Sequence, residues 1–409
     1  MKKILVVLTE SFPYSKGESF IENEINFYNA FNSVFIIPML PNGEIRQINL
    51  PENISINKIN PINHFHKIKF CLKGCFKIHF WSEIFSVLLS LKHVTIKIKA
   101  LLSYITYGEW YTSQVIKVIK AQNVPSSSQI IFYSYWMMQG AYASTRLKKS
   151  FYNAQAVSRC HRWDVYEYLN KEYYLPLRKY LLNNLDKVYS ISNNAIDYIN
   201  KNYHAAKTNL ILSRLGTNDH GVQNYNKKEN ELSIISCSWV VPVKRLDKII
   251  DSLMSITDIN IIWTHLGDGP LLEDMKEKSK SLPDNITCNF HGALSNKEIL
   301  THYRQNYHDI FLNVSDSEGV PVSIMEAISF GIPVIATNVG ASNEIVINEE
   351  SGYILEQDES VDNIRAKILY INQLSESAYF NLRKKTRKYW ESNYLAITNY
   401  QNFIQSLSE

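Results

Sequence analysis

The feature that most constrains this chain is an alternation of short β-rich runs with amphipathic helical stretches, and this alternation occurs twice along the sequence. Apolar residues make up 45% of the chain, which is enough to bury large cores and is far from a disordered composition. The length of 409 residues exceeds the roughly 250 to 300 residues at which a single core stops growing. The sequence therefore predicts two α/β domains, each with a parallel sheet covered by helices.

Ten strands are expected, five in each half. In the first half they are residues 4–9, 34–38, 129–134, 154–158 and 187–191. In the second half they are residues 232–237, 261–266, 287–290, 310–314 and 333–336. We place the first domain at residues 1–225 and the second at 226–388. A terminal helix within residues 389–409, read from Tyr389 to Leu407, is expected to pack back onto the first domain.

The two halves differ in charge. Residues 226–409 contain 17 Lys and Arg against 25 Asp and Glu, a net charge of −8, which leaves 26 against 14, or +12, for the first part. The most basic segment, residues 64–99, has one acid, Glu83, and these lysines: Lys67, Lys69, Lys73, Lys77, Lys92, Lys97 and Lys99. Aromatic residues lie between them, which is typical of a helix at an anionic membrane surface. A core helix with a solvated lysine face is the alternative. Nucleic acid is not expected, because no nucleic-acid-binding module is recognisable.

Several other classes of protein are disfavoured by the sequence. No stretch approaches the ~20 apolar residues of a spanning helix, and the short apolar run at residues 4–8 suits a buried strand better than a secretory signal. The five cysteines are scattered and lack zinc spacing. We expect a cytoplasmic protein, peripheral on the inner face of the cell membrane, with no disulfide scaffold, metal or cofactor.

Glycine-containing turns follow three of the strands in the second half. They are Gly267-Asp268-Gly269-Pro270, His291-Gly292 and the run from Ser315 to Pro321. Ligands of open α/β sheets bind beyond the carboxyl ends of the strands, and glycine lets the backbone approach a ligand closely. These three turns are therefore candidate parts of a binding site, although each one alone is also consistent with an ordinary turn.

The segment EGVPVSIME, from Glu318 to Glu326, is the most informative. Pro321 suits the first turn of a helix that begins near Val322, with Glu318 in the loop before it and Glu326 about one turn inside. The start of such a helix offers free amides and a positive dipole to a phosphate, and carboxylates accept hydrogen bonds from sugar hydroxyls. The pattern favours a sugar nucleotide as ligand; the alternative is a pair of glutamates that only cap their own helix.

Six segments resemble, in family order, the retaining GT-B glycosyltransferases of the group-1 (glycosyltransferase family 4-like) type, known from bacterial polysaccharide biosynthesis. They are Ser11-Phe12-Pro13 with Gly17, SRCHRWDVYE, RLGTN, GDGP, FHG, and EGVPVSIME with the following GIPVIATNVGASNEIV and SGYIL. The resemblance implies two Rossmann-like domains facing each other across a cleft. It also implies metal-independent, retaining transfer from a UDP- or GDP-sugar to a glycan acceptor, which we expect to be lipid-linked in capsule, exopolysaccharide or O-antigen biosynthesis.

The same resemblance implies roles for individual residues. Lys244 would neutralise the donor diphosphate, Glu318 would bind the transferred sugar, and His161 would lie beside that sugar near the acceptor. Glu326 would bind the ribose hydroxyls. The remaining substrate-binding candidates are Gly17, Asp164, Arg245, Gly319, Val320, Pro321, Val322, His291, Ala293 and Leu294.

The chain departs from the family pattern before Lys244. Ser238-Trp239 stands where the family commonly has Gly-Arg, so one cation is missing and Arg245 is the candidate replacement. His161 and Lys244 also have alternative interpretations, as a structural histidine and as a solvated residue opening a helix. Two rival functions remain: a sugar-nucleotide 2-epimerase of the same architecture, and a non-catalytic two-lobed sugar-nucleotide-binding protein.

Overall fold

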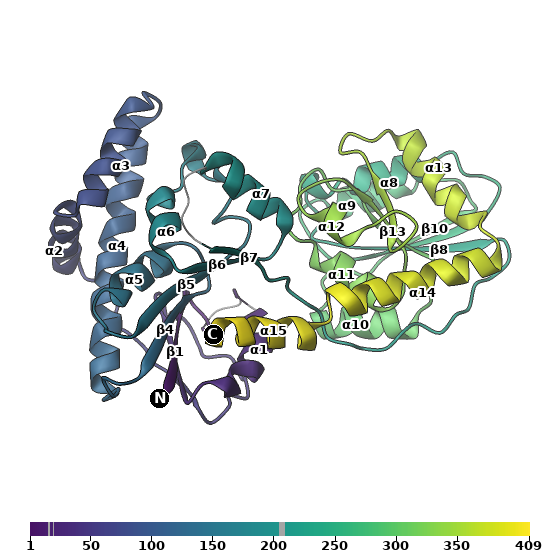
Figure 1. Cartoon of the computed structure of the whole chain (residues 1–409). Helices are drawn as coiled ribbons and strands as arrows, with labels where there is room; N and C mark the ends of the chain where they lie inside the picture. The colour runs from purple at the N-terminus through teal and green to yellow at the C-terminus, as the bar shows by residue number, and fades with distance from the viewer. Residues whose placement is uncertain (15–16, 19, 204–208) are drawn as a thin grey trace. The chain divides into compact units, whose positions relative to one another are not determined.

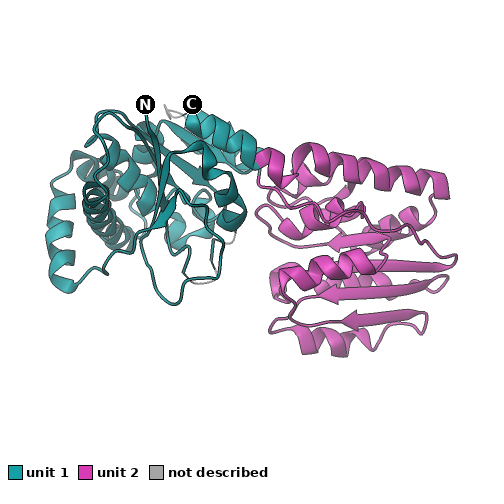
Figure 2. Ribbon diagram, turned by 90° about the horizontal axis from the view of Figure 1, so that it is seen from below, with its two compact units in different colours: residues 1–214, 400–409 teal, residues 215–399 magenta. Residues whose placement is uncertain are grey.

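The computed structural model describes residues 1–14, 17–18, 20–203 and 209–409, and the chain divides into two compact units (Figure 2). The first unit contains Met1–Arg214 and Tyr400–Glu409, and the second contains Leu215–Asn399. Each unit is built on its own parallel sheet, as the sequence predicts. The domain boundaries placed at 225 and 388 from sequence both fall inside the second unit.

The first unit has a seven-stranded parallel sheet in the order β3-β2-β1-β4-β5-β6-β7; Figure 1 labels β1, β4, β5, β6 and β7. Its strands are β1 Lys3–Thr9, β2 Ser33–Pro38, β3 Ile54–Ile56, β4 Gln129–Ser134, β5 Ala154–Cys160, β6 Lys187–Ser190 and β7 Asn209–Leu212. Its helices are α1 Phe20–Glu24, α2 His64–Cys75, α3 Ile78–Leu89, α4 Val94–Ala121, α5 Gln139–Lys148, α6 Arg178–Asn184 and α7 Asn193–Asn202. Three 3₁₀ helices complete it: η1 Ile25–Ala30, η2 Glu167–Leu169 and η3 Lys171–Tyr173.

Strand β1 shows why this sheet is buried on both faces. Its residues are apolar almost without interruption, as expected for a strand covered by helices on either side. Leu5 and Val7 belong to the core that includes residues of α1 and η1, whereas Ile4 and Val6 belong to the core formed with α4 and α5. The carboxyl ends of the strands are consequently the accessible edge for a ligand.

The second unit has a six-stranded parallel sheet in the order β10-β9-β8-β11-β12-β13. Its strands are β8 Glu231–Cys237, β9 Asn260–Leu266, β10 Ile286–Phe290, β11 Ile310–Asn313, β12 Val334–Thr337 and β13 Gly352–Leu355. Its helices are α8 Leu246–Leu253, α9 Leu272–Ser279, α10 Asn296–Gln305, α11 Val322–Ser329, α12 Ser342–Ile345, α13 Val361–Asn372 and α14 Glu376–Asn393, with the 3₁₀ helix η4 Pro242–Lys244.

All ten expected strands are confirmed, with bounds that differ by two residues at most. The expected terminal helix from Tyr389 to Leu407 is wrong as a single element. Tyr389 lies inside α14, and a new helix, α15 (Ala396–Ser408), begins after a break at Tyr394, whose φ is −131° and ψ is 11°. The break separates a helix that packs on α11 in the second unit from one whose apolar residues belong to the core of the first.

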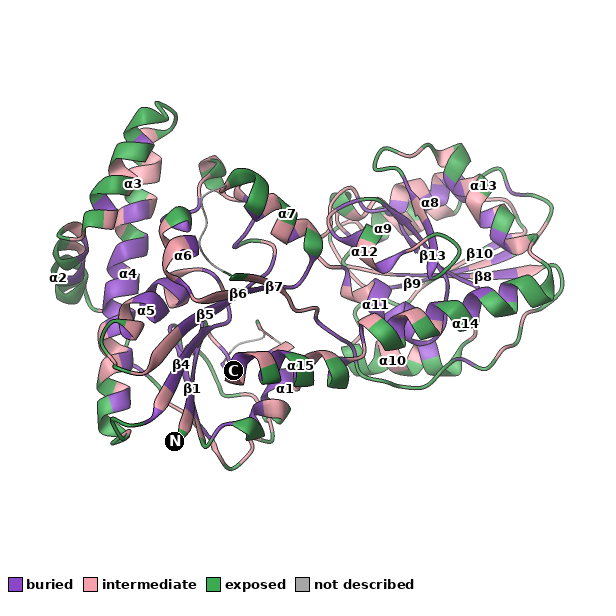
Figure 3. Ribbon diagram, viewed as in Figure 1, coloured by how far each residue is buried: buried purple, intermediate pink, exposed green. Residues whose placement is uncertain are grey.

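The basic segment 64–99 forms α2, α3 and the start of α4. Helices α2 and α3 are mostly exposed (Figure 3); α2 buries only Phe70 and Gly74, and α3 only Phe80 and Val87. Among the helices of the described residues, none is both long enough and apolar enough to cross a membrane.

Candidate functional site

In the second unit, the loops after three adjacent strands, β9, β8 and β11, meet at the carboxyl edge of the sheet. The amide of Asp316, after β11, donates to the carbonyl of Val243, after β8, at 2.8 Å, and Val240 N donates to the carbonyl of Asp268, after β9, at 2.8 Å. Gly267 has a φ of +142°, and a Cβ there would lie 1.9 Å from the Ser238 carbonyl oxygen. Glycine is therefore required for these loops to approach each other.

Lys244 and Glu318, both predicted from sequence, are brought together in this edge. Lys244 ends η4, and its Nζ donates to Glu318 Oε1 at 2.7 Å. Asn313 Nδ2 donates to the same oxygen at 3.2 Å, and the Glu318 side chain is 8% exposed. The sequence analysis did not include Asn313, although a polar residue closing the buried strand IFLN is a usable signal. The three side chains form one hydrogen-bonded group.

Glu326 lies one turn inside α11 and is 8% exposed. Burial raises the pKa of its carboxyl to about 7, against the opposing effect of the hydrogen bond from Asn296; Asn296 Nδ2 donates to Oε1 at 2.6 Å. The helix begins at Val322, as predicted, with Pro321 at the N-cap, and among the described side chains none caps it. The first N–H groups of α11 have no intrahelical acceptor, so they can meet an anion.

Arg245, the candidate second cation, is held by two carboxylates of its own unit. Its guanidinium pairs with Asp247 at 3.2 Å and with Asp316 at 3.1 Å. The hydrogen bond from Asp247 is the main reason that the pKa of Arg245 is raised. Its backbone is left-handed, with a φ of 52°. Trp239, at the position of the missing family cation, is 58% exposed. Arg245 as a diphosphate ligand therefore stays a prediction.

The predicted base-binding loop, His291 to Leu294, leads directly into α10. His291 N donates to the carbonyl of His265 at 3.1 Å, and His291 and Ala293 are exposed, with Leu294 half-buried. Ser295 then caps α10, whose first residue is the Asn296 that contacts Glu326. Of the other predicted residues, Gly319 accepts a hydrogen bond from Ala341 N at 2.9 Å, and Val320 is half-buried.

His161 and Asp164 lie in the first unit, in the loop after β5. The His161 ring is 4.4 Å from the ring of Trp136 and 4.7 Å from that of Tyr135, and its two nitrogens have no hydrogen-bond partner among the described residues. Asp164 is fully buried; it accepts from His161 N and Met137 N, each at 2.7 Å. Burial acts to raise the pKa of Asp164, but the side chain of His161, whose Nδ1 lies 3.9 Å from Asp164 Oδ2, and the hydrogen bond from Met137 N outweigh it, and the pKa is lowered. Asp164 thus holds the backbone that carries His161.

Gly17, the last of the predicted residues, is exposed in the loop after β1, and Arg46 donates to its carbonyl. Its neighbour Glu18 was missed, because no motif distinguishes it in the sequence. The Glu18 carboxylate accepts from three successive amides, Glu10 N and Ser11 N at 2.9 Å and Phe12 N at 2.7 Å, and from Trp136 Nε1 at 2.9 Å. Glu18 therefore positions the indole that packs on His161.

Within the described residues, no cluster of three or more His, Cys, Asp or Glu side chains is arranged to hold a metal ion. The sequence Asp316-Ser317-Glu318 contains two acids that could suggest a metal site. Each acid is instead paired with a cation, Asp316 with Arg245 and Glu318 with Lys244.

Two parallel α/β domains, joined in this order and closed by a terminal helix on the first, define the GT-B fold. Solved structures with this fold resemble nearly the whole chain. The alignment with the lipopolysaccharide outer core galactosyltransferase WaaB covers 98% of this chain and 99% of the WaaB chain, with a TM-score of 0.66 and 15% identity. Alr3699/HepE of Anabaena, in complex with UDP and glucose, covers 99% of both chains at a TM-score of 0.61 and 13% identity.

The sequence comparison finds a family model that matches part of the chain. Residues 219–392, which lie within the second unit, match the family model described as glycosyl transferases group 1. An uncharacterised glycosyltransferase of Haemophilus influenzae is 24% identical over 184 residues, which is 44% of this chain. The chain spans about half the length of that curated relative, and the likeness to the solved structures is one of fold.

Proposed function

We propose that this protein is a retaining glycosyltransferase that moves a sugar from a nucleoside diphosphate to a hydroxyl of a glycan acceptor. The observation that carries the proposal is the group formed by Lys244 and Glu318 beside the start of α11, with Glu326 one turn inside that helix. A cation and helix amides suit a diphosphate, and two carboxylates suit hydroxyl groups on either side of it. The HepE complex with UDP and glucose supports a nucleotide-sugar donor.

In the proposed reaction, the bond between the anomeric carbon and the donor phosphate breaks as the acceptor hydroxyl forms its bond on the same face of the sugar. The hydroxyl proton passes to the departing phosphate oxygen. Lys244 Nζ and the first amides of α11 stabilise the charge that develops on this phosphate, while Glu318 orients the sugar hydroxyls. We expect no metal requirement, so activity should persist in the presence of EDTA.

The test uses Lys244→Ala and Glu318→Gln. Removal of a donor to developing charge typically lowers kcat by about 10² to 10³-fold, and each variant should lose at least 100-fold in sugar transfer. Glu350→Gln, on an exposed turn of the same unit, is the matched control and should retain activity. Product analysis separates the rival functions: release of an epimerised sugar identifies an epimerase, and nucleotide affinity without turnover identifies a binding protein. Undiminished transfer by Glu318→Gln would contradict the assignment.

We further propose that α2 and α3 place the enzyme on an anionic membrane, where it meets a lipid-linked acceptor. Ten large apolar residues of this region are exposed: Phe65, Ile68, Leu72, Phe76, Ile78, Trp81, Phe85, Leu88, Leu89 and Leu91. Along α3 they recur at helical spacing, opposite the buried Phe80 and Val87. Such a contiguous apolar face is uncommon on a monomeric soluble protein. Exposed lysines surround it, notably Lys67, Lys69, Lys92 and Lys99.

The contacts beneath these helices hold the face in place. Gly74 of α2 packs directly on Ile105 of α4, and Lys73 pairs with the buried Glu109 of α4 at 3.0 Å. The single acid of the segment, Glu83, is turned inward: it accepts from the Tyr174 hydroxyl at 2.9 Å and from Leu177 N at 3.2 Å. The outward face is therefore apolar and basic, the combination that binds anionic lipid headgroups.

Flotation with vesicles tests this contact. The full chain should float with vesicles that contain anionic lipid, and binding should weaken with salt. Trp81→Ser with Phe85→Ser should reduce the bound fraction at least fivefold, whereas Phe380→Ser, an exposed aromatic of the second unit, should not. Equal binding by the double variant, or binding to neutral and anionic vesicles alike, would contradict the proposal.

A further inference from the structure

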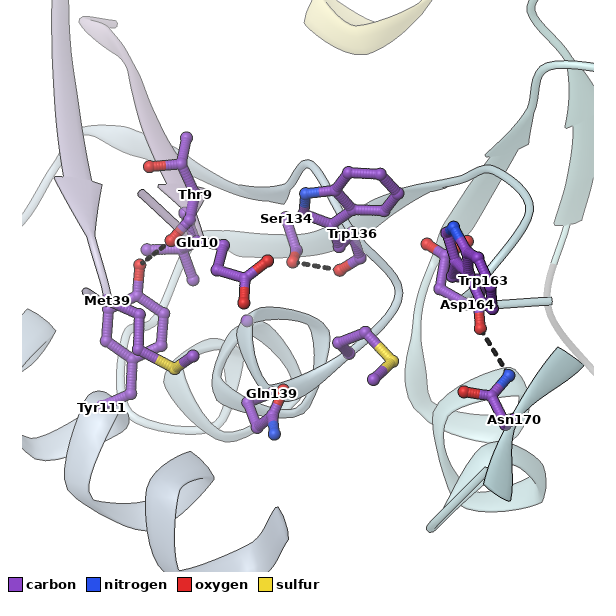
Figure 4. Close-up of a pocket in the computed structure, with 13 residues that line it drawn as sticks. Thr9, Glu10, Met39, Tyr111, Ser134, Trp136, Gln139, Trp163, Asp164 and Asn170 are labelled. Carbon is purple, nitrogen blue, oxygen red and sulfur yellow. Dashed lines mark hydrogen bonds between the residues drawn. The ribbon is translucent and has the colours of Figure 1, made fainter. Parts of the chain in front are cut away.

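A cavity of about 270 Å³ opens at the carboxyl edge of the sheet in the first unit. Its walls come from the ends of β1 and β4, from the start of α5 and from the loop after β5 (Figure 4). Known ligand pockets measure roughly 300 to 1,000 Å³, so this cavity is slightly smaller than that range. It has room for one ring rather than for a large ligand.

We propose that this cavity binds an uncharged, hydroxylated sugar ring, with Glu10 as its principal hydrogen-bond acceptor and Trp136 and Trp163 as its apolar walls. The proposal rests on the proposed function in one respect, because the ring would be the acceptor's terminal sugar. It adds a chemical class that the donor site does not define: a neutral sugar, as distinct from a uronate or a sugar phosphate.

Glu10 is the group best placed to recognise hydroxyls. Figure 4 shows its side chain at the centre of the cavity, reaching toward the start of α5, with Tyr111 and Met39 to one side and the two tryptophans to the other. Within the described part of the chain, the Glu10 carboxylate has no hydrogen-bond partner, in contrast to Glu18, which binds three amides. Glu10 is an exposed residue, but partial burial of its carboxyl, together with the nearby charge of Glu18, raises its pKa. Hydroxyl donors would replace the water that a bound ring displaces from this carboxylate.

The two tryptophans supply surfaces on which the apolar face of a sugar ring can lie. Trp136 is fixed by its indole hydrogen bond to Glu18 and by its packing on His161. Trp163 is 56% exposed, and its loop is tied down by Asn170, which donates to the Trp163 carbonyl at 2.7 Å. Large aromatic surfaces that are already held in position reduce the entropy cost of binding.

The charge of the described lining disfavours an anionic ring. Among the described lining residues there is no Lys, Arg or His, whereas Glu10 and Asp164 are acidic; Arg162, which is not one of them, has its guanidinium 5.6 Å from the centre of the Trp163 ring. The Asp164 carboxylate is already bound by two backbone amides, so Glu10 is the acid that a ligand would meet. A carboxylate or phosphate on the bound ring would be repelled by the charge of Glu10 where the two lie side by side.

Saturation-transfer NMR on the full chain tests this selectivity. The probes are methyl α-glucopyranoside and methyl α-galactopyranoside, each paired with the corresponding uronate at equal concentration. At least one neutral ring should bind, and its uronate should bind at least fivefold more weakly. Glu10→Gln should weaken binding of the neutral ring at least fivefold. It should also reduce the difference in affinity between the neutral ring and its uronate, because the repulsive charge is removed. Trp163→Ala should weaken neutral binding without altering the preference.

Controls separate this site from the donor site. Glu44→Gln, which changes an exposed acid outside the cavity, should bind the neutral ring as tightly as the unmodified protein does. UDP should shift the melting temperature of the unmodified protein and of Glu10→Gln by the same amount. A failure of UDP to bind would therefore count against the proposed function and not against the cavity proposal. The cavity proposal is overturned if no neutral ring binds at tens of millimolar, if uronates bind equally well, or if Glu10→Gln and Trp163→Ala leave binding unchanged while Glu318→Gln abolishes it.

Discussion

At the scale of single residues, Glu326 illustrates how burial prepares a carboxyl for a ligand. The side chain has one described hydrogen-bond donor, Asn296, and little water, so its charged form is poorly solvated and its pKa rises to about 7. A ribose that donates two hydroxyl hydrogen bonds would favour the carboxylate form. Nucleotide binding and ionisation of Glu326 are therefore expected to be linked.

This linkage predicts a dependence of stability on pH. Because the pKa is raised on folding from 4.5 to about 7, the folded protein binds the proton more tightly, and the stabilisation present at low pH is lost as pH rises toward 7. The free energy of unfolding should fall by up to about 1.4 kcal/mol per pH unit over this window from this group. Denaturant unfolding at pH 5.5 and 8 should show no such fall in the free energy of unfolding for Glu326→Gln. This variant should be more stable than the unmodified protein at pH 8. An unchanged decline in the variant would contradict the shift.

Nucleotide affinity should change in the opposite direction. UDP should bind more tightly as pH rises from 6 to 8, because the carboxylate is the better acceptor for hydroxyls. Calorimetric titrations of the unmodified protein should show several-fold tighter binding at pH 8, and Glu326→Gln should abolish this dependence. Titration of the phosphate itself is controlled by repeating the series with the variant in the same buffers.

At the scale of elements, the site in the second unit depends on contacts between loops as much as on the loops themselves. Gly340, in the turn after β12, has a φ of +58°, and a Cβ there would lie 2.2 Å from the carbonyl oxygen of Glu318. The amide of Ala341 then donates to Gly319 O. This turn therefore supports the backbone of the segment that carries Glu318.

Gly340→Ala should consequently impair activity beyond its effect on stability. The added methyl must displace the backbone of Glu318, and we expect sugar transfer to fall at least tenfold while the protein stays folded. Gly221→Ala is a matched control, because Gly221 has a similar φ of +87° but no neighbour within 4 Å of an added Cβ. It isolates the cost of backbone strain, about 1 to 2 kcal/mol. Equal activity of the two variants would contradict a supporting role for Gly340.

The sequence predicts helices and strands well where the apolar pattern is strongly periodic. It predicts them poorly where an element is short or where tertiary contacts determine its bounds. The ten expected strands were found because buried parallel strands are long apolar runs. Strands β3, β7 and β13 were missed; each is short and also lies at an edge of its sheet, where one side of the strand has no neighbouring strand. Glu318 and Glu326 were predicted from the EGVPVSIME segment and Lys244 from the family resemblance, whereas Asn296 and Glu18 act through contacts that no local pattern records. The break between α14 and α15 likewise depends on contacts that no local pattern records.

At the scale of the whole molecule, the chain ends in the unit where it began. Residues Tyr400–Glu409 belong to the first unit, where Phe403, Ile404 and Leu407 join the core against β1 and β4. Lys3 Nζ and Lys187 Nζ donate to the carbonyls of Ser408 and Ser406 at 2.8 and 2.7 Å. The core of the first unit thus includes residues that follow the second unit in the sequence.

Phe403 is one of the buried residues that attach α15 to the first unit. Its ring lies 4.0 Å from the guanidinium of Arg159, which forms a buried ion pair with Glu24 in which both side chains are fully enclosed. Phe403→Ala should cost about 3 to 5 kcal/mol for the lost packing, and the uncovered ion pair would add to it. Because the damage is confined to the first unit, hydrogen exchange should accelerate in β4 to β6 and stay unchanged in β8 to β11.

Ile397→Ala, at a position 51% exposed on the same helix, should leave both sheets protected. Equal acceleration in the two sheets would show instead that the units unfold as one, and protection of β4 to β6 in Phe403→Ala would show that α15 is dispensable for the first core.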